Sequence, residues 1–449
     1  MTQLARVSNA AGDGRHHRSF VRFAFRGAVV LLVLLTSTVS FGRVEFGASA
    51  ADADASVGCL YPLSGRSAIF GKDSIAGMRL ALQDLETEIP PERLAKIRVL
   101  VDDDHSHTSI ATRIAEDYIE QDKVKFLCGI VSSSLARVVS RIAEQHKIIM
   151  IGTDHASSRL TIEESHQYYF RVSNDTYASM SAGALYLKAL QQRTGWKKIA
   201  FIGPDYELGH VAAQDLEDSL KQLGVQYEMV GYFWPKLYEP DYTNYISAIR
   251  ESGADIVVNV LWGGDFIAFL QQAMSAGVLD KTWLANFDSG GSYDVLVSLG
   301  DRVPQHLILS ARHHVNWPDT ATNRKFVDDF HKLEGRYPTY VAEGAYAGIK
   351  AIGYALAKAG KHADTEQLIH ALEGMHLPLP KDPPGTVSYL DPNTHQILQA
   401  EAIGEVVPNR QYPPAQVMLG NWTVYPATLL TPSPDLIRRR RLHLKTIEY

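Results

Sequence analysis

Apolar runs typical of buried strands alternate with segments of helical periodicity along most of this chain, and this alternation constrains the fold more than any other feature. The first four runs are 56–63, 96–104, 125–131 and 147–152, separated by helical segments at 73–86, 109–122 and 132–146. The pattern begins again near residue 172, with runs at 197–205, 225–233, 254–262 and 282–287. Such alternation requires right-handed crossovers and a parallel sheet. Because 449 residues exceed what one core supports, we predict an α/β protein with two doubly wound parallel-sheet lobes.

The N-terminal 50 residues have the composition of a secretory signal peptide rather than of a folded segment. Five arginines lie within residues 1–26, an uncharged apolar run follows at 28–42, and Ala48-Ser49-Ala50 has the small-x-small form of a cleavage site. The alternative is an uncleaved membrane anchor, but the apolar run is shorter than the ~20 residues that span a bilayer. We therefore predict export to the periplasm, with the leader 1–50 cleaved near Ala50.

Charge and motifs exclude several classes of function. The formal net charge of −6 provides no general basic footprint for nucleic acid. The sequence contains no phosphate-binding glycine loop, no nucleophile elbow and no zinc-protease helix motif. His155, His313 and His314 are candidate metal ligands. Adjacent residues on a strand point to opposite faces, however, so His313 and His314 are poor joint ligands. We expect neither catalysis nor a cofactor or metal.

The chain has two cysteines, Cys59 and Cys128, in the first and third apolar runs. These runs are neighbours in a doubly wound sheet of order 2-1-3-4-5. A disulfide is permitted outside the cytoplasm but is awkward between adjacent parallel strands. We therefore expect two buried thiols.

Polar and aromatic side chains follow the strands of both predicted sheets, at the carboxyl edge where open α/β sheets bind ligands. In the first series they are Ser64, Ser132, Ser133, Ser134, Thr153, Asp154 and His155, and in the second Asp205, Tyr206, Trp262, Asp265, Asp288 and Ser289. A serine that opens a helix leaves backbone N–H groups directed at an anion such as a carboxylate. An aspartate receives an ammonium, and aromatic rings supply apolar walls. Helix capping is the simpler explanation of each serine alone, so the prediction depends on the group.

Several segments, in order, give the chain a family resemblance. GCLYPLSGRSAIFGKDSIAGMRLALQDL (58–85), CGIVSSSLARVV with IIMIGTDHASSRLT, YYFRVSNDT (168–176) and PPGTVSYLDPNTHQ (383–396) resemble type I periplasmic solute-binding proteins of the branched-chain amino acid and amide group. The resemblance covers about residues 56–408. It implies two lobes, joined by a three-stranded hinge, that close on one small solute and deliver it to the permease of an ABC importer.

The resemblance also implies roles for particular residues. Ser133, with Ser132 beside it, and Asp154 and Ala156 match positions that hold the ligand carboxylate in relatives, while Asp288 matches the acid that holds an amino group. Tyr206 lies two residues before Leu208, where relatives commonly have a tyrosine. Asp154 and Ala156 depart from the family pattern and favour an amide, urea, polyamine-like or hydroxylated ligand over a leucine-type one, and Trp262 suits a flat ligand.

The predicted organisation places 51–172 with 310–380 in the first lobe and 173–309 with 381–410 in the second. Residues 411–449 remain as an extension, and we expect its basic run Arg438–Arg441 to be a solvated tail. We expect a monomer that binds an amino acid, amide or urea. The alternative function is a ligand-sensing subunit of a signalling system with the same fold.

Overall fold

The computed structural model describes residues 42–447, so the apolar run of the predicted leader lies almost wholly outside the described residues. The first sheet has the strand order β1-β3-β2-β4-β5-β6. Its strands are β1 (Val44–Gly47), β2 (Ala55–Tyr61), β3 (Ile97–Asp103), β4 (Phe126–Gly129), β5 (Ile149–Gly152) and β6 (Tyr169–Arg171). All pairs are parallel except β1 with β3. Without the antiparallel edge strand β1, this is the predicted 2-1-3-4-5 order.

The second sheet repeats the same winding and adds two antiparallel strands, in the order β16-β15-β11-β10-β9-β7-β8. Its strands are β7 (Lys198–Ile202), β8 (Glu228–Phe233), β9 (Ile256–Asn259), β10 (Trp283–Asn286), β11 (Leu307–Ser310), β15 (Glu401–Pro408) and β16 (Val417–Tyr425). A small third sheet joins β12 (His376–Leu377), β13 (Ser388–Leu390) and β14 (Ile397–Leu398). The predicted α/β class with two parallel-dominated sheets is confirmed.

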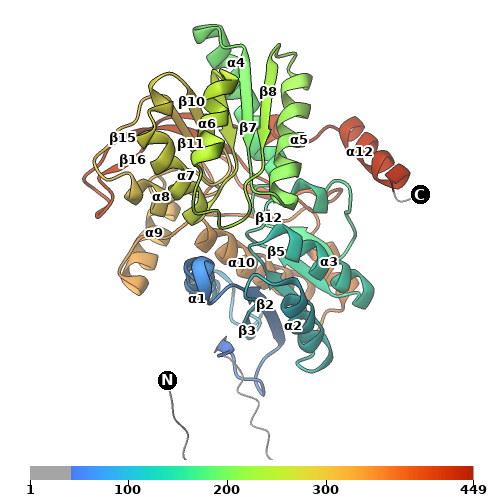
Figure 1. Cartoon of the computed structure of the whole chain (residues 1–449). Helices are drawn as coiled ribbons and strands as arrows, with labels where there is room; N and C mark the ends of the chain where they lie inside the picture. Colours follow the sequence, from blue (N-terminus) through green and yellow to red (C-terminus); the bar gives the residue numbers. More distant parts are fainter. Residues whose placement is uncertain (1–41, 448–449) are drawn as a thin grey trace, which may run out of the picture. The chain divides into compact units, whose positions relative to one another are not determined.

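Helices pack on both sheets and define two lobes (Figure 1). The first lobe contains α1 (Ala68–Glu88), α2 (Thr108–Glu120), α3 (Ser133–His146), α9 (Ala321–Glu334), α10 (Val341–Ala359) and α11 (Thr365–Leu372). The second contains α4 (Thr176–Thr194), α5 (Glu207–Gln222), α6 (Thr243–Ser252), α7 (Gly263–Ser275) and α8 (Tyr293–Ser298). In chain order, β1–β6 belong to the first sheet, β7–β11 to the second, β12–β14 to the small third sheet, and β15 and β16 again to the second. Among the described residues, no helix combines the length and apolarity needed to cross a membrane.

Local sequence explains where these helices begin and how closely they pack. Asp175 caps α4 by accepting the Ala178 N–H, and Asp364 with Gln367 forms a capping box at α11. Helix α1 meets α10 at Gly77, where an added Cβ atom would collide with the Ala342 carbonyl. The missing side chain lets the two helices approach closely.

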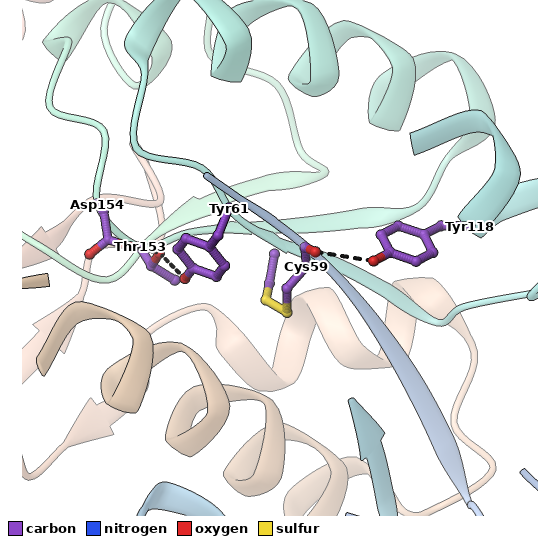
Figure 2. Close-up of a disulfide and its surroundings, with 6 residues drawn as sticks. Cys59, Tyr61, Tyr118, Thr153 and Asp154 are labelled. Carbon is purple, nitrogen blue, oxygen red and sulfur yellow. Dashed lines mark hydrogen bonds between the residues drawn. A yellow bond between two sulfur atoms is a disulfide. The ribbon is translucent and has the colours of Figure 1, made fainter. Parts of the chain in front are cut away.

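The expectation of two free buried thiols is wrong. Cys59 on β2 and Cys128 on β4 are paired directly in register, with Cα atoms 4.4 Å apart, and form a disulfide (Figure 2). Both side chains are buried, and the Tyr118 hydroxyl donates to the Cys59 carbonyl oxygen at 3.1 Å. Direct pairing brings the two Cα atoms within the range that a disulfide spans.

The expectation of a solvated basic tail is also wrong for two of its four arginines. The chain after β16 forms helix α12 (Pro434–Ile447). Arg440 is 5% exposed and pairs with Asp215 and Asp218 of α5, and Arg441 donates to the Ile162 carbonyl oxygen. Arg438 is exposed and pairs with Asp435 within its own helix. The acidic partners are distant in sequence, so the local pattern of like charges could not reveal them.

Candidate functional site

Arg312 connects the carboxyl ends of strands from both sheets. It follows β11, and its Nη2 atom donates to Asp288 Oδ2 at 3.0 Å, just beyond β10 of the second lobe. Its Nη1 atom donates to the carbonyl oxygen of Asp154, which follows β5 of the first lobe. All three residues are buried. The two sheet edges that bind ligands in open α/β folds therefore meet at this arginine.

Hydrogen bonds to Asn286 hold the loop that carries Asp288. Asn286, the last residue of β10, accepts the backbone N–H groups of Asp288, Ser289 and Gly290 on its Oδ1 atom at 3.2, 3.1 and 2.8 Å. Its amide group donates in turn to Asn259 Oδ1 at 2.7 Å. These hydrogen bonds fix the position of the loop that carries Asp288.

Electrostatics favour the charged form of Arg312. Burial alone would lower the pKa of its guanidinium, but the negative charge of Asp288, together with Tyr340 and Asp154, outweighs burial and raises it. The guanidinium also lies over the Tyr340 ring, 4.6 Å from the ring centroid. The Tyr340 pKa is raised mainly by burial.

Aromatic rings form the apolar wall beside this pair. Phe70 of α1 lies 5.5 Å from Trp262 and 5.9 Å from Tyr340, measured between ring centroids. Trp262 and Tyr206 are the N-cap residues of α7 and α5, and Trp262 Nε1 donates to the Tyr206 hydroxyl at 3.0 Å. Burial raises the pKa of Tyr206, which keeps its hydroxyl protonated. The wall thus combines residues of both lobes.

The two lobes also contact each other near the aromatic wall, through Ser67 and Arg66 of the first lobe and Tyr238 of the second. Ser67 and Tyr238 hydroxyls lie 3.0 Å apart, and Arg66 Nη1 donates to the Tyr238 carbonyl oxygen at 3.2 Å. A hollow beside this contact is lined by Arg66, Phe70, Tyr238, Trp262 and Asp265, among others. It adjoins the aromatic wall, because Phe70 and Trp262 line both.

Three buried polar atoms of the site have no hydrogen-bond partner among the described residues: Asp288 Oδ1, Ser289 Oγ and Arg312 Nε. Buried polar atoms are nearly always paired in folded proteins, because an unpaired one costs about 1–3 kcal/mol. One acceptor, one hydroxyl and one donor from adjoining residues are therefore open to hydrogen bonds from a partner that carries both a donor and an acceptor. We call Asp154, Tyr206, Trp262, Asp288, Ser289 and Arg312, with Phe70 and Tyr340, the interlobe site.

Comparison with known proteins identifies the family of this chain. A model of the periplasmic binding protein family matches residues 55–411. The chain belongs to the periplasmic binding protein family. The Leu/Ile/Val-binding protein homolog 8 of Brucella suis biovar 1 is 28% identical to it over 363 residues, covering 78% of this chain and 86% of that protein.

Solved structures of periplasmic binding proteins show the same fold. A solute-binding protein of an ABC transporter from Rhodopseudomonas palustris BisB5, in complex with 3,4-dihydroxybenzoic acid, matches with a TM-score of 0.72 at 23% identity, covering 85% of this chain and 98% of that one. An amino acid ABC transporter substrate-binding protein from Pseudomonas fluorescens Pf-5 gives a TM-score of 0.72 at 21% identity, with coverage of 86% and 98%. The predicted resemblance to periplasmic binding proteins is confirmed by the family match, and the solved structures show the same fold.

The structure brings together four of the nine residues predicted for the site of this periplasmic binding protein: Asp154, Tyr206, Trp262 and Asp288. Asp154 joins the site through its backbone carbonyl oxygen, while its carboxylate turns into the first lobe. There it accepts from Thr153 Oγ1 at 2.5 Å, and Thr153 lies 2.7 Å from the Tyr61 hydroxyl (Figure 2). Burial raises the pKa of the Asp154 carboxyl to about 7, opposed by the Thr153 hydrogen bond and Arg312.

The predicted serines make their contacts outside the interlobe site, whereas Ala156 lies in the same hydrophobic cluster as Phe70, Trp262 and Tyr340. Ser132 is the half-buried N-cap of α3, and Ser133 Oγ accepts the Ser157 N–H at 3.2 Å. The Ala156 carbonyl oxygen accepts from Thr176 and Arg171. Ser64 is exposed, and its hydroxyl lies 2.8 Å from His105 Nδ1.

His155 points into the first lobe. Its Nδ1 atom lies 3.0 Å from the Ile130 carbonyl oxygen and its Nε2 atom 2.6 Å from the Tyr169 hydroxyl. Burial lowers its pKa well below the usual histidine value, so the imidazole is neutral.

Sequence reasoning missed three residues of the interlobe site: Phe70, Arg312 and Tyr340. Arg312 ends the apolar run LILSAR (307–312) and lies two residues beyond a strand, the kind of position that identified Asp288. The same strand-end rule would therefore have found it. Phe70 lies in α1 and Tyr340 is the N-cap of α10, so no strand-end rule reaches them.

Proposed function

We propose that this protein is the extracytoplasmic substrate-binding component of an ABC importer, which encloses a small solute between its lobes and releases it unchanged to a permease. The observation that carries the proposal is the group of unpartnered buried atoms on Asp288, Ser289 and Arg312. They lie where the carboxyl ends of two sheets converge, and a solute with matching polar groups would satisfy them.

The site favours a solute with both a hydrogen-bond donor and an acceptor and a flat or apolar remainder. Asp288 Oδ1 would accept from the donor, Arg312 Nε would donate to the acceptor, and Phe70, Trp262 and Tyr206 would cover the remainder. Amino acids, amides and urea carry such a pair. The curated relatives named for leucine, isoleucine and valine support the first of these.

The disulfide supports a location outside the cytoplasm. Structural disulfides persist in oxidising compartments such as the periplasm and are rare where thiols are kept reduced. The buried Cys59–Cys128 bridge therefore agrees with export directed by the N-terminal leader.

Isothermal titration calorimetry with amino acids, amides and urea tests the proposal. At least one solute should bind, and Asp288→Asn should weaken its binding by about 2 kcal/mol, or roughly 30-fold, because a charged acceptor is lost. Asp205→Asn is the matched control, since Asp205 lies beyond a strand of the same sheet but is 55% exposed and pairs with His210. Binding by no solute, or equal affinities in the wild type and Asp288→Asn, would reject the site.

A further inference from the structure

Arg312 and Asp288 place one positive and one negative charge in the same buried site. Arg312 is 5% exposed and Asp288 is fully buried. Each keeps one unpartnered polar atom, Arg312 Nε and Asp288 Oδ1, besides the bond that joins them at 3.0 Å. The pair is balanced in charge, yet each member can still bind a solute group.

We propose that this pair makes Arg312 a specificity-determining residue, which selects solutes of zero net charge, either neutral amides or zwitterions, and rejects simple carboxylate anions. A solute of zero net charge leaves the buried charges balanced. An anion adds a negative charge that no described cation of the site offsets, and an uncompensated buried charge is strongly unfavourable. The inference rests on the proposed function and names the solute class for the same site.

The carboxyl group of Asp154 strengthens the selection against anions. Asp154 is buried, and Arg312 contacts its backbone carbonyl oxygen and interacts with its carboxyl group through charge. When this carboxyl is protonated, the site is neutral, and when it is ionised, the site carries a net negative charge. In neither state does the site favour an anion.

Matched solute pairs test the proposal by calorimetry at pH 7.5. The pairs are leucine with 4-methylpentanoate, phenylalanine with 3-phenylpropanoate, and benzamide with benzoate. In the wild type the member of zero net charge should bind at least 10-fold more tightly. Asp288→Asn should reverse the order by leaving Arg312 as the surplus charge, while the control Asp205→Asn should keep it.

The outcomes separate this proposal from the proposed function. If no member of any pair binds, the proposed function fails and the inference fails with it. If an anion binds the wild type as tightly as its partner, or if Asp288→Asn leaves the order unchanged, charge selection by Arg312 is overturned while solute binding stands.

A different observation concerns helix α12, which lies beyond residues 55–411 that match the family model. Arg440 Nη1 lies 2.7 Å from Asp215 Oδ1, and its Nη2 atom 2.7 Å from Asp218 Oδ2, both on α5 of the second lobe. The same guanidinium lies 3.4 Å from Ser158 Oγ and 3.8 Å from Glu163 Oε1 in the first lobe.

Neighbouring residues of α12 extend the contact with both lobes. Arg441 Nε donates to the Ile162 carbonyl oxygen at 2.7 Å and its Nη2 atom to Ser165 Oγ at 2.6 Å. Leu436 is buried with Ile162 and with Tyr177 of α4. Helix α12 (red in Figure 1) therefore contacts the first lobe through 158–165 and the second through α4 and α5.

The geometry points to α12 as a strap that joins the lobes and holds them in the arrangement that encloses solute. Loss of the Arg440 contacts should let the lobes separate, so part of the binding free energy is then spent on bringing them together. Solute affinity should fall although Arg440 lies outside the interlobe site.

Full-length Arg440→Gln tests the strap, with Arg438→Gln as control because Arg438 is exposed and pairs within α12. Arg440→Gln should weaken solute binding about 5–10-fold and increase the radius of gyration of the solute-free protein in small-angle scattering. Asp218→Asn removes one partner of Arg440, so it should also weaken solute binding and increase the radius of gyration. This second variant keeps the test valid if Arg440→Gln folds poorly. Unchanged affinity and radius in Asp218→Asn and in folded Arg440→Gln would overturn the strap.

Discussion

Cys59 and Cys128 lie directly opposite each other on the adjacent parallel strands β2 and β4, and a disulfide joins them in the centre of the first sheet. The bridge closes a loop between residues 69 positions apart. In the chain-entropy model such a loop restricts the unfolded state enough to stabilise the fold by about 4 kcal/mol.

We expect Cys59→Ala/Cys128→Ala to lower the free energy of unfolding by about that amount, measured by urea denaturation. A reductant that acts on the unfolded chain should lower the stability of the wild type toward that of the variant and leave the variant unchanged. The reduced wild type keeps both sulfur atoms, so this arm separates the cross-link from the lost side-chain volume. Equal stabilities in oxidising buffer would contradict the prediction.

Local periodicity predicted the strands and the sheet order because each buried run and each amphipathic segment carries its pattern within a few residues. The register between neighbouring strands has no such local pattern, and the Cys59–Cys128 pairing depends on that register. Arg440 and its partners on α5 show the same limit, since only the folded chain brings them together. At the site, the strand-end rule identified Asp288 and Trp262, but it could not show that the Asp154 carboxylate turns away and its carbonyl oxygen faces Arg312.

The contact between α1 and α10 makes a second stability prediction. Gly77→Ala would place a methyl group against the Ala342 carbonyl, and backbone atoms cannot yield as a flexible side chain can. We expect a loss of about 2 kcal/mol or more in the free energy of unfolding. Gly264→Ala is the control, because a Cβ atom there meets nothing within 4 Å. If the two variants are equally stable, the close approach does not limit the packing.

The contacts of β1 bear on where the leader ends. Arg43 lies 2.9 Å from both Asp102 and Asp122, and β1 pairs with β3 along the edge of the first sheet. Cleavage near Ala50 would remove this strand, whereas Ser40-Phe41-Gly42 also has the small-x-small form and would leave it in place.

We therefore predict that the exported protein begins at or before Arg43. N-terminal sequencing and intact mass of protein from the periplasmic fraction provide the measurement. Gly42→Pro should block or shift processing, whereas Ala50→Pro should not. A mature N-terminus at Ala51 would contradict this expectation and support the cleavage point predicted from the sequence.

Glu343 on α10 predicts how stability depends on pH. It is 1% exposed, its Oε1 atom has no partner among the described residues, and burial raises the pKa of its carboxyl to about 8, partly offset by Lys381. Between the ordinary glutamate pKa and about 8, the folded state holds a proton that the unfolded state has lost. The contribution of this group to stability therefore falls as pH rises through that window.

Glu343→Gln keeps the shape of the side chain and removes the titration. The difference in unfolding free energy between variant and wild type should move in favour of the variant from pH 5 to pH 8, by up to about 1.4 kcal/mol per pH unit. Urea denaturation at pH 5, 6.5 and 8 measures it, with the exposed Glu251→Gln as control. Because Lys381 and Asp382 also interact with Glu343, the test uses this difference rather than the wild-type profile alone. A difference that stays constant across the three pH values would show that Glu343 is already ionised in the folded protein at pH 5.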